Sequence, residues 1–372
     1  MSAAAKESPI RVCFVAPKAY PLFNPEVKGV LGGAEVDLYF LATELAKDKD
    51  FAVSFLTADY GQKETETVEG VKIIKTLDFR ESPLVGAIKV WKGLRKADAH
   101  IYFQEAASWG TFLVALFCRL HKRIFFYRTA SEQECDGTYL KQHCFAGRAF
   151  RWSLRNAAQT IVQNEIDKNN IKRTIGICST VIPNAHRLPV LREVQRDTIL
   201  WVGRSAQLKR PELFIQLAEK MPNEKFVMIC QHATGDEKYE ELLARAEEVK
   251  NLQFIEHVPF REIDGYFQQA KVFVSTSESE GFPNTFIQAC NYAVPILSLN
   301  VNPDGFLDKH NCGQCCNGQF QKLIDSLKIM LQEQRYLEIG RNARRYVEEH
   351  HDPTKIIWKY KAVFLQLAGQ LK

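Results

Sequence analysis

Glu280 stands in a stretch whose residue order predicts a site for a phosphate or a sugar. Residues 277–289 follow the strand-like run 271–276 and lead into an apolar helical pattern. Where a strand gives way to a helix, the first helical N–H groups lack intrahelical partners and the helix dipole is positive, which suits a phosphate group. In an open α/β sheet, ligands also bind at the carboxyl ends of the strands. A plain strand–turn–helix corner with a surface Glu is the competing interpretation.

Two cations, Arg204 and Lys209, follow another strand-like run. Arg204 closes the run, and Lys209 precedes a helix that Pro211 opens. The short polar loop between strand and helix places both cations near one strand end. There they could clamp a diphosphate, since Arg offers two donors and Lys a mobile point charge. Taken alone, the pattern also fits an exposed pair of surface cations.

The string Gly32-Gly33-Ala34-Glu35 follows the first strand-like run and opens a helix. Glycines at such a place permit positive φ and let the backbone approach a ligand closely. By itself a pair of glycines is weak evidence, because most such pairs only form a loop.

Together these strings resemble the retaining, nucleotide-sugar-dependent glycosyltransferases of family 4, which have the GT-B fold. Glu280, with the polar Gln288 eight positions later, resembles the E-x7-E motif, and Arg204 with Lys209 matches the Gly-Arg-x4-Lys element. The resemblance implies that Arg204 and Lys209 stabilise the leaving diphosphate. It also implies that Glu280 holds the hydroxyls of the donor sugar or supports charge near the anomeric carbon.

The resemblance further implies a set of donor-binding residues. Gln288 stands where the family has a second Glu that binds the ribose hydroxyls; an amide still accepts and donates hydrogen bonds, so we expect altered affinity. Val258 lies in a segment that resembles the one contacting the nucleotide base through its backbone. Backbone contacts require no particular side chain, so the segment does not indicate which nucleotide is bound. The candidate donor-binding residues are Gly32, Gly33, Val258, Gly281, Phe282, Asn284, Thr285 and Gln288.

The first half of the chain departs from the family pattern. Many members place a His after the strand that corresponds to residues 123–130, whereas this chain has Thr129-Ala130-Ser131 and then a cluster of acids. Glu105, Glu134 and Asp136 are candidates to take over acceptor binding or proton handling. Acidic loop residues are more often simply solvated.

Short apolar runs alternate with helical patterns along the whole chain, which predicts parallel α/β architecture. The resemblance implies two Rossmann-like, doubly wound domains facing across a cleft, residues 1–190 and 191–352, with a final helix, 353–372, that crosses back to the first. Predicted helices include 34–46, one that begins at Pro211, and 354–371. The predicted strands are 10–15, 51–57, 71–74, 101–103, 124–127, 160–162, 199–202, 226–229, 254–255, 272–275 and 296–299.

Charge is unevenly distributed along the 372 residues. The net charge is +5, but residues 89–173 hold fifteen Lys or Arg and seven Asp or Glu, a balance of +8. Aromatic side chains are interleaved there, which suggests weak, salt-sensitive contact with anionic membranes and a membrane-bound acceptor. Ordinary solvated helices with snorkelling side chains would show the same pattern. No groove-reading or base-stacking motif accompanies the charge, so a nucleic-acid partner is not expected.

The ten Cys and a polar N-terminus without a signal-peptide core predict a cytoplasmic protein with mostly reduced thiols. Cys312-Gly313-Gln314-Cys315-Cys316 has the look of a zinc site but lacks a second Cys pair, so a turn of small residues is expected instead. We expect no cofactor and no metal, since Arg204, Lys209 and helix N-termini can neutralise a diphosphate.

The resulting hypothesis is a retaining glycosyltransferase that moves a sugar from a nucleotide-diphosphate sugar to a hydroxyl on a glycan, lipid-linked or small-molecule acceptor. Two alternatives remain open. One is a GT-B nucleotide-sugar epimerase or hydrolase, and the other is a non-catalytic protein that binds a glycan or a nucleotide sugar.

Overall fold

The computed structural model describes residues 8–29, 31–233, 235–260 and 262–369. Its contacts divide the chain into two compact units, Met1–Ala185 with Thr354–Lys372, and His186–Pro353. The boundary falls after Ala185, whereas the sequence predicts it after residue 190. Residues 1–7 and 370–372, which include most of the polar N-terminus and the end of the expected final helix, lie outside the described residues.

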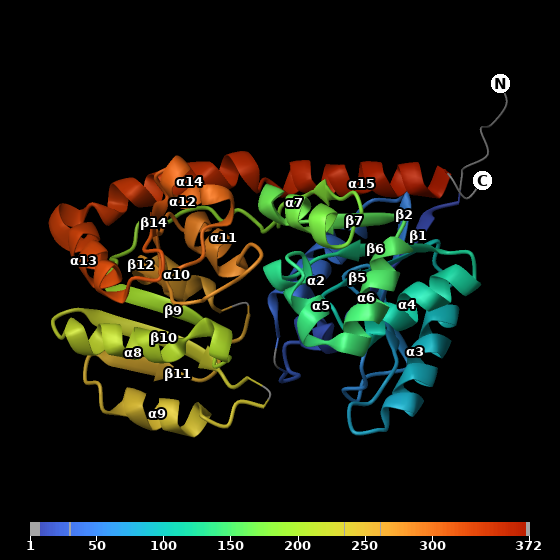
Figure 1. Ribbon diagram of the computed structural model, residues 1–372, viewed down its shortest axis with the longest axis horizontal. Coiled ribbons are helices and arrows are strands. Elements are labelled where there is room, and N and C mark those ends of the chain that lie inside the picture. The colour runs from blue at the N-terminus through green and yellow to red at the C-terminus, as the bar shows by residue number, and fades with distance from the viewer. Residues whose placement is uncertain (1–7, 30, 234, 261, 370–372) are drawn as a thin grey trace. The chain divides into compact units, whose positions relative to one another are not determined.

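The first unit is built on one sheet, whose described strands lie in the order β3-β4-β2-β1-β5-β6-β7-β8 (Figure 1). All neighbours pair in parallel except β3 and β4. Parallel strands covered on both faces need nearly continuous apolar runs, which is why the sequence shows them. The strands are β1 (Ile10–Val15), β2 (Phe51–Thr57), β3 (Thr65–Val68), β4 (Val71–Lys75), β5 (Ile101–Glu105), β6 (Ile124–Arg128), β7 (Gln159–Val162) and β8 (Thr180–Val181).

Helices cover both faces of this sheet. Side chains of α3, α4, α6 and α7 form one core with the strand residues that point to their face, such as Tyr102 and Tyr127. On the opposite face, Phe364 of α15 packs against Phe103 and Phe126. The helices of this unit are α1 (Tyr20–Phe23), α2 (Gly33–Leu45), α3 (Pro83–Ala97), α4 (Trp109–Leu120), α5 (Thr138–Gln142), α6 (Cys144–Arg155), α7 (Glu165–Thr174) and α15 (Pro353–Gly369), with short 3-10 turns at Pro17–Ala19 and Glu132–Glu134.

The second unit repeats this plan with an all-parallel sheet, whose described strands have the order β11-β10-β9-β12-β13-β14. Neighbouring residues of β9 serve opposite faces: Trp201 packs with α8, α9 and α13, and Leu200 packs with α10, α11, α12 and α14. The strands are β9 (Thr198–Arg204), β10 (Lys225–Gln231), β11 (Leu252–Ile255), β12 (Ala270–Ser275), β13 (Ile296–Ser298) and β14 (Gly313–Cys315).

The helices of the second unit follow its strands in alternation, as the sequence predicts. Pro211 occupies the first position of α8, where its missing N–H costs no hydrogen bond. The helices are α8 (Pro211–Lys220), α9 (Tyr239–Glu247), α10 (Asp264–Gln269), α11 (Asn284–Asn291), α12 (Phe306–Lys309), α13 (Phe320–Leu331) and α14 (Tyr336–His350), with 3-10 turns at Gln207–Lys209, Pro303–Gly305 and Gln332–Gln334. None of the helices in the described residues is long and apolar enough to cross a membrane.

The cysteine-rich segment forms a strand, not the turn that the sequence predicts. Gly313 pairs with Ile296 in β14, and a Cβ on Gly313 would lie 1.8 Å from the carbonyl oxygen of Ile296. Only glycine allows that approach. Cys312 and Cys316 flank the strand and are buried, and burial raises the pKa of their thiols to about 12 and about 11.

Strand order places one switch point in each sheet. In the first unit β1 lies between β2 and β5, and in the second β9 lies between β10 and β12, so consecutive connections run in opposite directions from these strands. In doubly wound sheets, ligands bind outside the carboxyl ends of the strands at such a point. The edges formed by the ends of β1 and β5, and of β9 and β12, are therefore the places to look for a site.

A buried ion cluster lies at the end of β6 in the first unit. Arg128 pairs with Asp37 of α2 at 2.9 Å and with Glu105 of β5, and it donates a hydrogen bond to Asn184. Tyr360 of α15 lies beside it. Burial acts to lower the pKa of Arg128, but the negative charges of Glu105 and Asp37 outweigh it and raise that pKa. The guanidinium therefore remains charged and holds segments from distant parts of the chain.

We expect Arg128→Met to lower the free energy of unfolding of the first unit by about 3–5 kcal/mol, because it leaves two buried carboxylates without a cation. Denaturant unfolding followed by circular dichroism measures the loss. Arg123→Met is the matched control: Arg123 pairs with Asp98 at the surface, so its loss should cost less than about 1 kcal/mol. Equal losses in the two variants would contradict the assigned role of the cluster.

Candidate active site

The residues that the sequence singles out in the second unit lie at its switch point. Arg204 is the last residue of β9, and Lys209 ends the 3-10 turn that follows. Glu280 lies beyond β12, which pairs in parallel with β9, so both loops leave the same edge of the sheet. The structure thus brings Lys209 into contact with Glu280, 71 residues away in sequence, at the edge of the sheet where Arg204 ends β9.

Polar contacts clasp these two loops to each other. The ammonium group of Lys209 forms an ion pair with Glu280 Oε1. The hydroxyl of Thr276 donates to the carbonyl oxygen of Lys209 at 2.6 Å, and the N–H of Glu278 donates to the carbonyl oxygen of Leu208 at 2.8 Å. The Lys209 and Glu280 side chains remain 26% and 19% exposed, so a ligand can reach both.

Arg204 is half-buried and, among the described residues, has no ion-pair partner. The neighbouring Gly203 leaves room for the ring of Trp201, which a Cβ would meet at 2.7 Å. Trp201 in turn donates its indole N–H to Thr276 Oγ1 at 3.0 Å. The backbone that carries Arg204 is thereby fixed to the loop after β12, while the guanidinium stays available.

Helix α11 begins directly after the turn that contains Glu280. The ring of Phe282 is buried and packs against Phe306 at 5.1 Å and His351 at 4.8 Å, which anchors the turn. Asn284 and Thr285, in the first turn of the helix, are half-buried, while Gln288 is only 7% exposed. Gly281 is buried, and Val258 belongs to the core that packs against this helix.

Sequence reasoning missed the residues that hold the far end of α11. Arg196 donates to the carbonyl oxygens of Tyr292 at 2.6 Å, Ala293 at 3.0 Å and Ala270 at 3.1 Å. Arg344 donates to the carbonyl oxygen of Asn291 at 2.5 Å. Cations at the C-terminal end of a helix satisfy its last carbonyls and complement its dipole, so these two residues hold the C-terminal end of α11 in place. No local pattern reveals them, since their acceptors are backbone atoms.

In the first unit, Gly32 and Gly33 begin α2. The N–H of Gly32 donates to Glu35 Oε2 at 2.9 Å, which is half of a capping box. A Cβ on Gly32 would lie 2.8 Å from that oxygen, so the glycine lets the carboxylate close over the helix N-terminus. The approach of either glycine to a donor stays a prediction.

The three acidic candidates of the first unit have protein partners. Glu105 is buried against Arg128. Glu134 is 4% exposed and accepts from the hydroxyl of Tyr127 at 2.8 Å and from two backbone N–H groups, and burial raises its pKa to about 7. Asp136 accepts from the N–H and hydroxyl of Thr138 at 2.7 and 2.9 Å at the start of α5. Their role toward an acceptor stays a prediction.

No group of three or more His, Cys, Asp or Glu side chains within the described residues could hold a metal ion. Arg204 and Lys209 are two positive side chains that the end of β9 and the turn after it carry at the switch point.

The part of the chain that carries this site is similar to known proteins. Residues 184–346, which include the clasped loops and α11, match the model of the family "Glycosyl transferases group 1". The match covers less than half of the 372 residues. An "Uncharacterized glycosyltransferase" of Haemophilus influenzae is 24% identical over 222 residues, which make up 57% of this chain and 60% of that relative. The chain thus spans less than two thirds of the relative's length.

Solved structures extend the likeness over nearly the whole chain. Sucrose-phosphate synthase from Thermosynechococcus elongatus superposes with a TM-score of 0.80 at 16% identity, covering 96% of this chain and 99% of that one. Anabaena HepE, in complex with UDP-glucose, superposes with a TM-score of 0.71 at 14% identity, covering 97% and 98%. At such identity the likeness shows the fold, which is GT-B.

We expect the stability of the first unit to fall as pH rises, because of Glu134. A carboxyl whose pKa is raised from 4.5 to about 7 by folding gives stability that is present below pH 4.5 and lost as pH rises through 7. The loss amounts to about 3 kcal/mol. Denaturant unfolding at pH 5 and pH 8 should show this loss in the wild type and little of it in Glu134→Gln.

The matched control is Glu165→Gln, since the Glu165 side chain is 59% exposed in an ion pair with Lys168. That variant should keep the pH dependence of the wild type. Parallel curves for the wild type and Glu134→Gln would show that Glu134 is already ionised in the folded protein at pH 5.

Proposed function

We propose that the protein is a retaining glycosyltransferase that moves a sugar from a nucleotide-diphosphate sugar to a hydroxyl acceptor. The observation that carries this proposal is the ion pair of Lys209 with Glu280 at the switch point of the second sheet, where Arg204 also ends β9. Two cations and a carboxylate on clasped loops suit a diphosphate joined to a sugar. The family match of residues 184–346 and the UDP-glucose bound by HepE support it.

In this proposal each polar group of the site contacts a different part of the donor. Arg204 and Lys209 stabilise the negative charge that develops on the leaving diphosphate, and the N-terminus of α11 adds its first N–H groups. Glu280 holds the sugar hydroxyls, and Gln288 replaces a carboxylate at the ribose. With these cations in place, the reaction needs no metal.

Retention follows if the acceptor hydroxyl attacks from the face that the diphosphate leaves. The bond from the anomeric carbon to the diphosphate oxygen breaks, the bond to the acceptor oxygen forms, and the diphosphate oxygen takes the acceptor proton. The first unit would bind the acceptor, which is a glycan, a lipid-linked sugar or a small molecule. We propose a cytoplasmic location with weak peripheral contact at the inner membrane face.

Two other functions fit the same donor site. An epimerase or hydrolase would consume a nucleotide sugar without an acceptor, and a binding protein would not consume it at all. Turnover measured with and without acceptor separates all three. A thermal-shift screen of nucleotide sugars finds the donor, since a ligand at a hundred times its Kd adds about 2.7 kcal/mol of stability.

We expect Arg204→Ala and Lys209→Ala each to lower kcat by roughly 10²–10³-fold, as for the loss of one oxyanion donor. Their stability should change by less than about 1 kcal/mol, because both side chains are partly exposed. Steady-state kinetics and thermal unfolding of the same samples separate the two effects.

Arg210→Ala is the matched control for both variants. Arg210 lies in the same loop and contacts Glu212 and Glu278 at 3.6 and 3.7 Å, outside the proposed diphosphate contacts. It should keep kcat within a few-fold of the wild type. Wild-type turnover in Arg204→Ala and Lys209→Ala would contradict the assignment of these residues to the diphosphate site.

We expect Gln288→Glu to keep or strengthen nucleotide binding, because a carboxylate accepts more strongly from two ribose hydroxyls. Isothermal calorimetry with the nucleoside diphosphate measures the change. Markedly weaker binding would mean that Gln288 does not face the ribose.

A further inference from the structure

Six large apolar side chains are exposed in the first unit, five in the first halves of three helices and one, Phe79, in the loop before α3. Leu84 is 79% exposed, Phe145 76% and Trp109 61%. Such exposure of large apolar residues marks an interaction surface when they lie together. We call the set the apolar rim: Phe79, Leu84, Val85, Ile88, Trp109 and Phe145.

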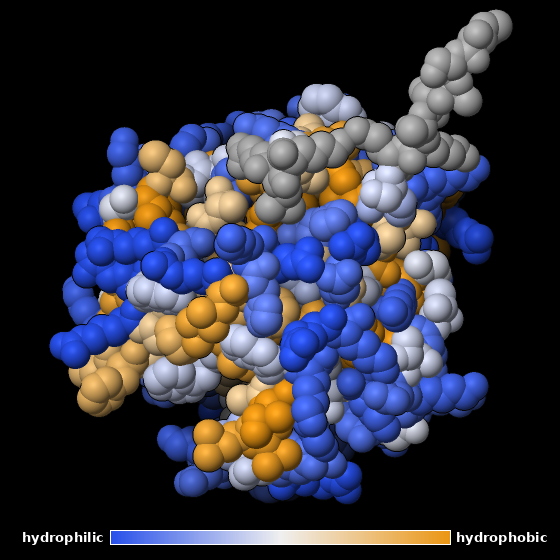
Figure 2. Space-filling model, turned by 90° about the vertical axis from the view of Figure 1, so that its right-hand side faces the viewer, coloured by the Kyte–Doolittle hydropathy of each residue, from blue (hydrophilic) through white to orange (hydrophobic). Residues whose placement is uncertain are grey.

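Topology brings the rim to one edge of the sheet. Helices α3 and α4 follow β4 and β5 directly, and α6 leads back into β7, so each begins at the carboxyl edge of the parallel strands. Helix α4 packs against α3 and against α6. The apolar residues therefore occupy the beginnings of three neighbouring helices, and Figure 2, which looks onto the side of the molecule where α3 and α4 lie, shows hydrophobic residues exposed among hydrophilic ones.

The same three helices carry cations and no acids. Helices α3, α4 and α6 contain four, one and three Lys or Arg, and their sequences contain no Asp or Glu. Every one of these cations follows the rim residue of its own helix. The surface thus changes from apolar to positive along α3 and α6, whereas α4 ends with Arg119 and the exposed Leu120.

Half of these cations are satisfied by the protein. Lys89 pairs with Glu81 and Lys96 with Glu64, while Arg119 and Arg155 donate to Asn156 and to the carbonyl oxygen of Ile175. Arg128, which also belongs to the basic segment 89–173, is buried. The exposed cations of the three helices that have no partner within the described residues are Lys92, Arg95, Arg148 and Arg151.

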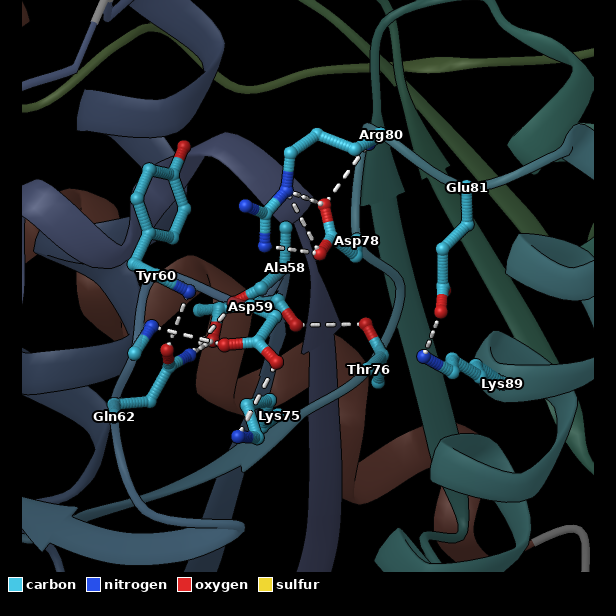
Figure 3. Close-up of polar contacts among 12 residues, drawn as sticks. Ala58, Asp59, Tyr60, Gln62, Lys75, Thr76, Asp78, Arg80, Glu81 and Lys89 are labelled. Atoms are coloured by element: carbon cyan, nitrogen blue, oxygen red, sulfur yellow. Dashed lines mark hydrogen bonds and ion pairs between the residues drawn. The ribbon is translucent and has the colours of Figure 1, made fainter.

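The loop that carries Phe79 is tied down on both sides. Arg80 folds back onto Asp78 with contacts of 2.6–3.1 Å, and Glu81 reaches Lys89 of α3 at 2.6 Å (Figure 3). The hydroxyl of Thr76 donates to the carbonyl oxygen of Thr57 at 2.7 Å, which fixes the loop to the end of β2. Phe79 is therefore presented by a fixed loop.

We propose that this surface docks the protein on an anionic lipid bilayer, with the apolar rim at the boundary of the acyl chains and the four unpaired cations at the level of the lipid phosphates. With a rise of 1.5 Å per residue, Lys92 and Arg95 lie about 6–11 Å along α3 from Ile88, so the cations and the apolar rim occupy successive levels of the helix.

Charge distinguishes the bilayer from a second copy of the chain. A symmetric dimer through this surface would bring the unpaired cations of one copy against those of the other, at a cost in repulsion. A layer of lipid phosphates over acyl chains is complementary to both the cations and the rim. The docking surface extends the proposed function, because it would bring the carboxyl edge of the first unit to membrane-bound acceptors, yet it can be tested without turnover.

Co-sedimentation of the full chain with phosphatidylcholine vesicles, with and without phosphatidylglycerol, tests the proposal. We expect binding only with the anionic lipid, strong at about 0.01 M salt and weak at about 1 M, where the Debye length falls from about 30 to 3 Å. Lys92→Glu with Arg95→Glu should weaken binding by more than about tenfold, at roughly fivefold per cation. Leu84→Glu with Ile88→Glu should weaken it at least as much, because an aliphatic side chain loses its burial.

The matched control replaces Lys328 and Ile329 by Glu, since this adjacent pair on α13 is also exposed and belongs to the other unit. It should bind as the wild type does. Three outcomes would each overturn the proposal. They are equal binding to both vesicle types, unchanged binding of the rim variant (Leu84→Glu with Ile88→Glu), and a change in that variant's oligomeric state alone. Donor turnover with a water-soluble acceptor should be unchanged in the rim variant, so failure of docking and failure of the glycosyltransferase proposal are distinguishable.

Discussion

A buried charge needs an oppositely charged partner, and this constraint organises the first unit around Arg128. Its carboxylate partners come from α2 and β5, its amide partner is Asn184 next to the unit boundary, and Tyr360 of α15 lies alongside. Segments from both ends of the chain thus converge on one guanidinium at the carboxyl edge of the sheet. Because these charged side chains are buried, no part of the cluster can move without exposing a charge or leaving it unpaired.

The second unit uses its cations in the opposite way. Arg196 and Arg344 donate to carbonyl oxygens at the C-terminal end of α11, whereas Arg204 and Lys209 lie at the end of β9 and in the turn after it and remain partly exposed. The helix is held at one end so that the other can present its N–H groups in a fixed place. Such preorganisation is what electrostatic stabilisation of a leaving group requires, since the donors need not rearrange when charge develops.

Much of this fold is visible in the sequence because parallel strands need apolar runs: β1 and β2 have the predicted bounds, and Pro211 begins α8 as expected. The strands β3, β8 and β14 were missed, since β3 is a polar edge strand, β8 has only two residues and β14 begins with glycine. Glu280 and Lys209 were recognised by local motifs. The burial of Glu134 and the capping by Arg196 depend on partners distant in sequence, up to 97 residues for Arg196, which no window along the chain can contain.

One exposed cysteine allows the surface of α3, α4 and α6 to be labelled selectively. All ten are free, eight of them buried, and burial raises the pKa of thiols such as Cys13 and Cys230 to about 12. Because the thiolate is the reactive form, an alkylating dye will discriminate strongly in favour of the two exposed thiols, Cys144 and Cys178. Cys144 is the first residue of α6 and adjoins Phe145, so after Cys178→Ser the native chain carries a single selective attachment point for a polarity-sensitive fluorophore.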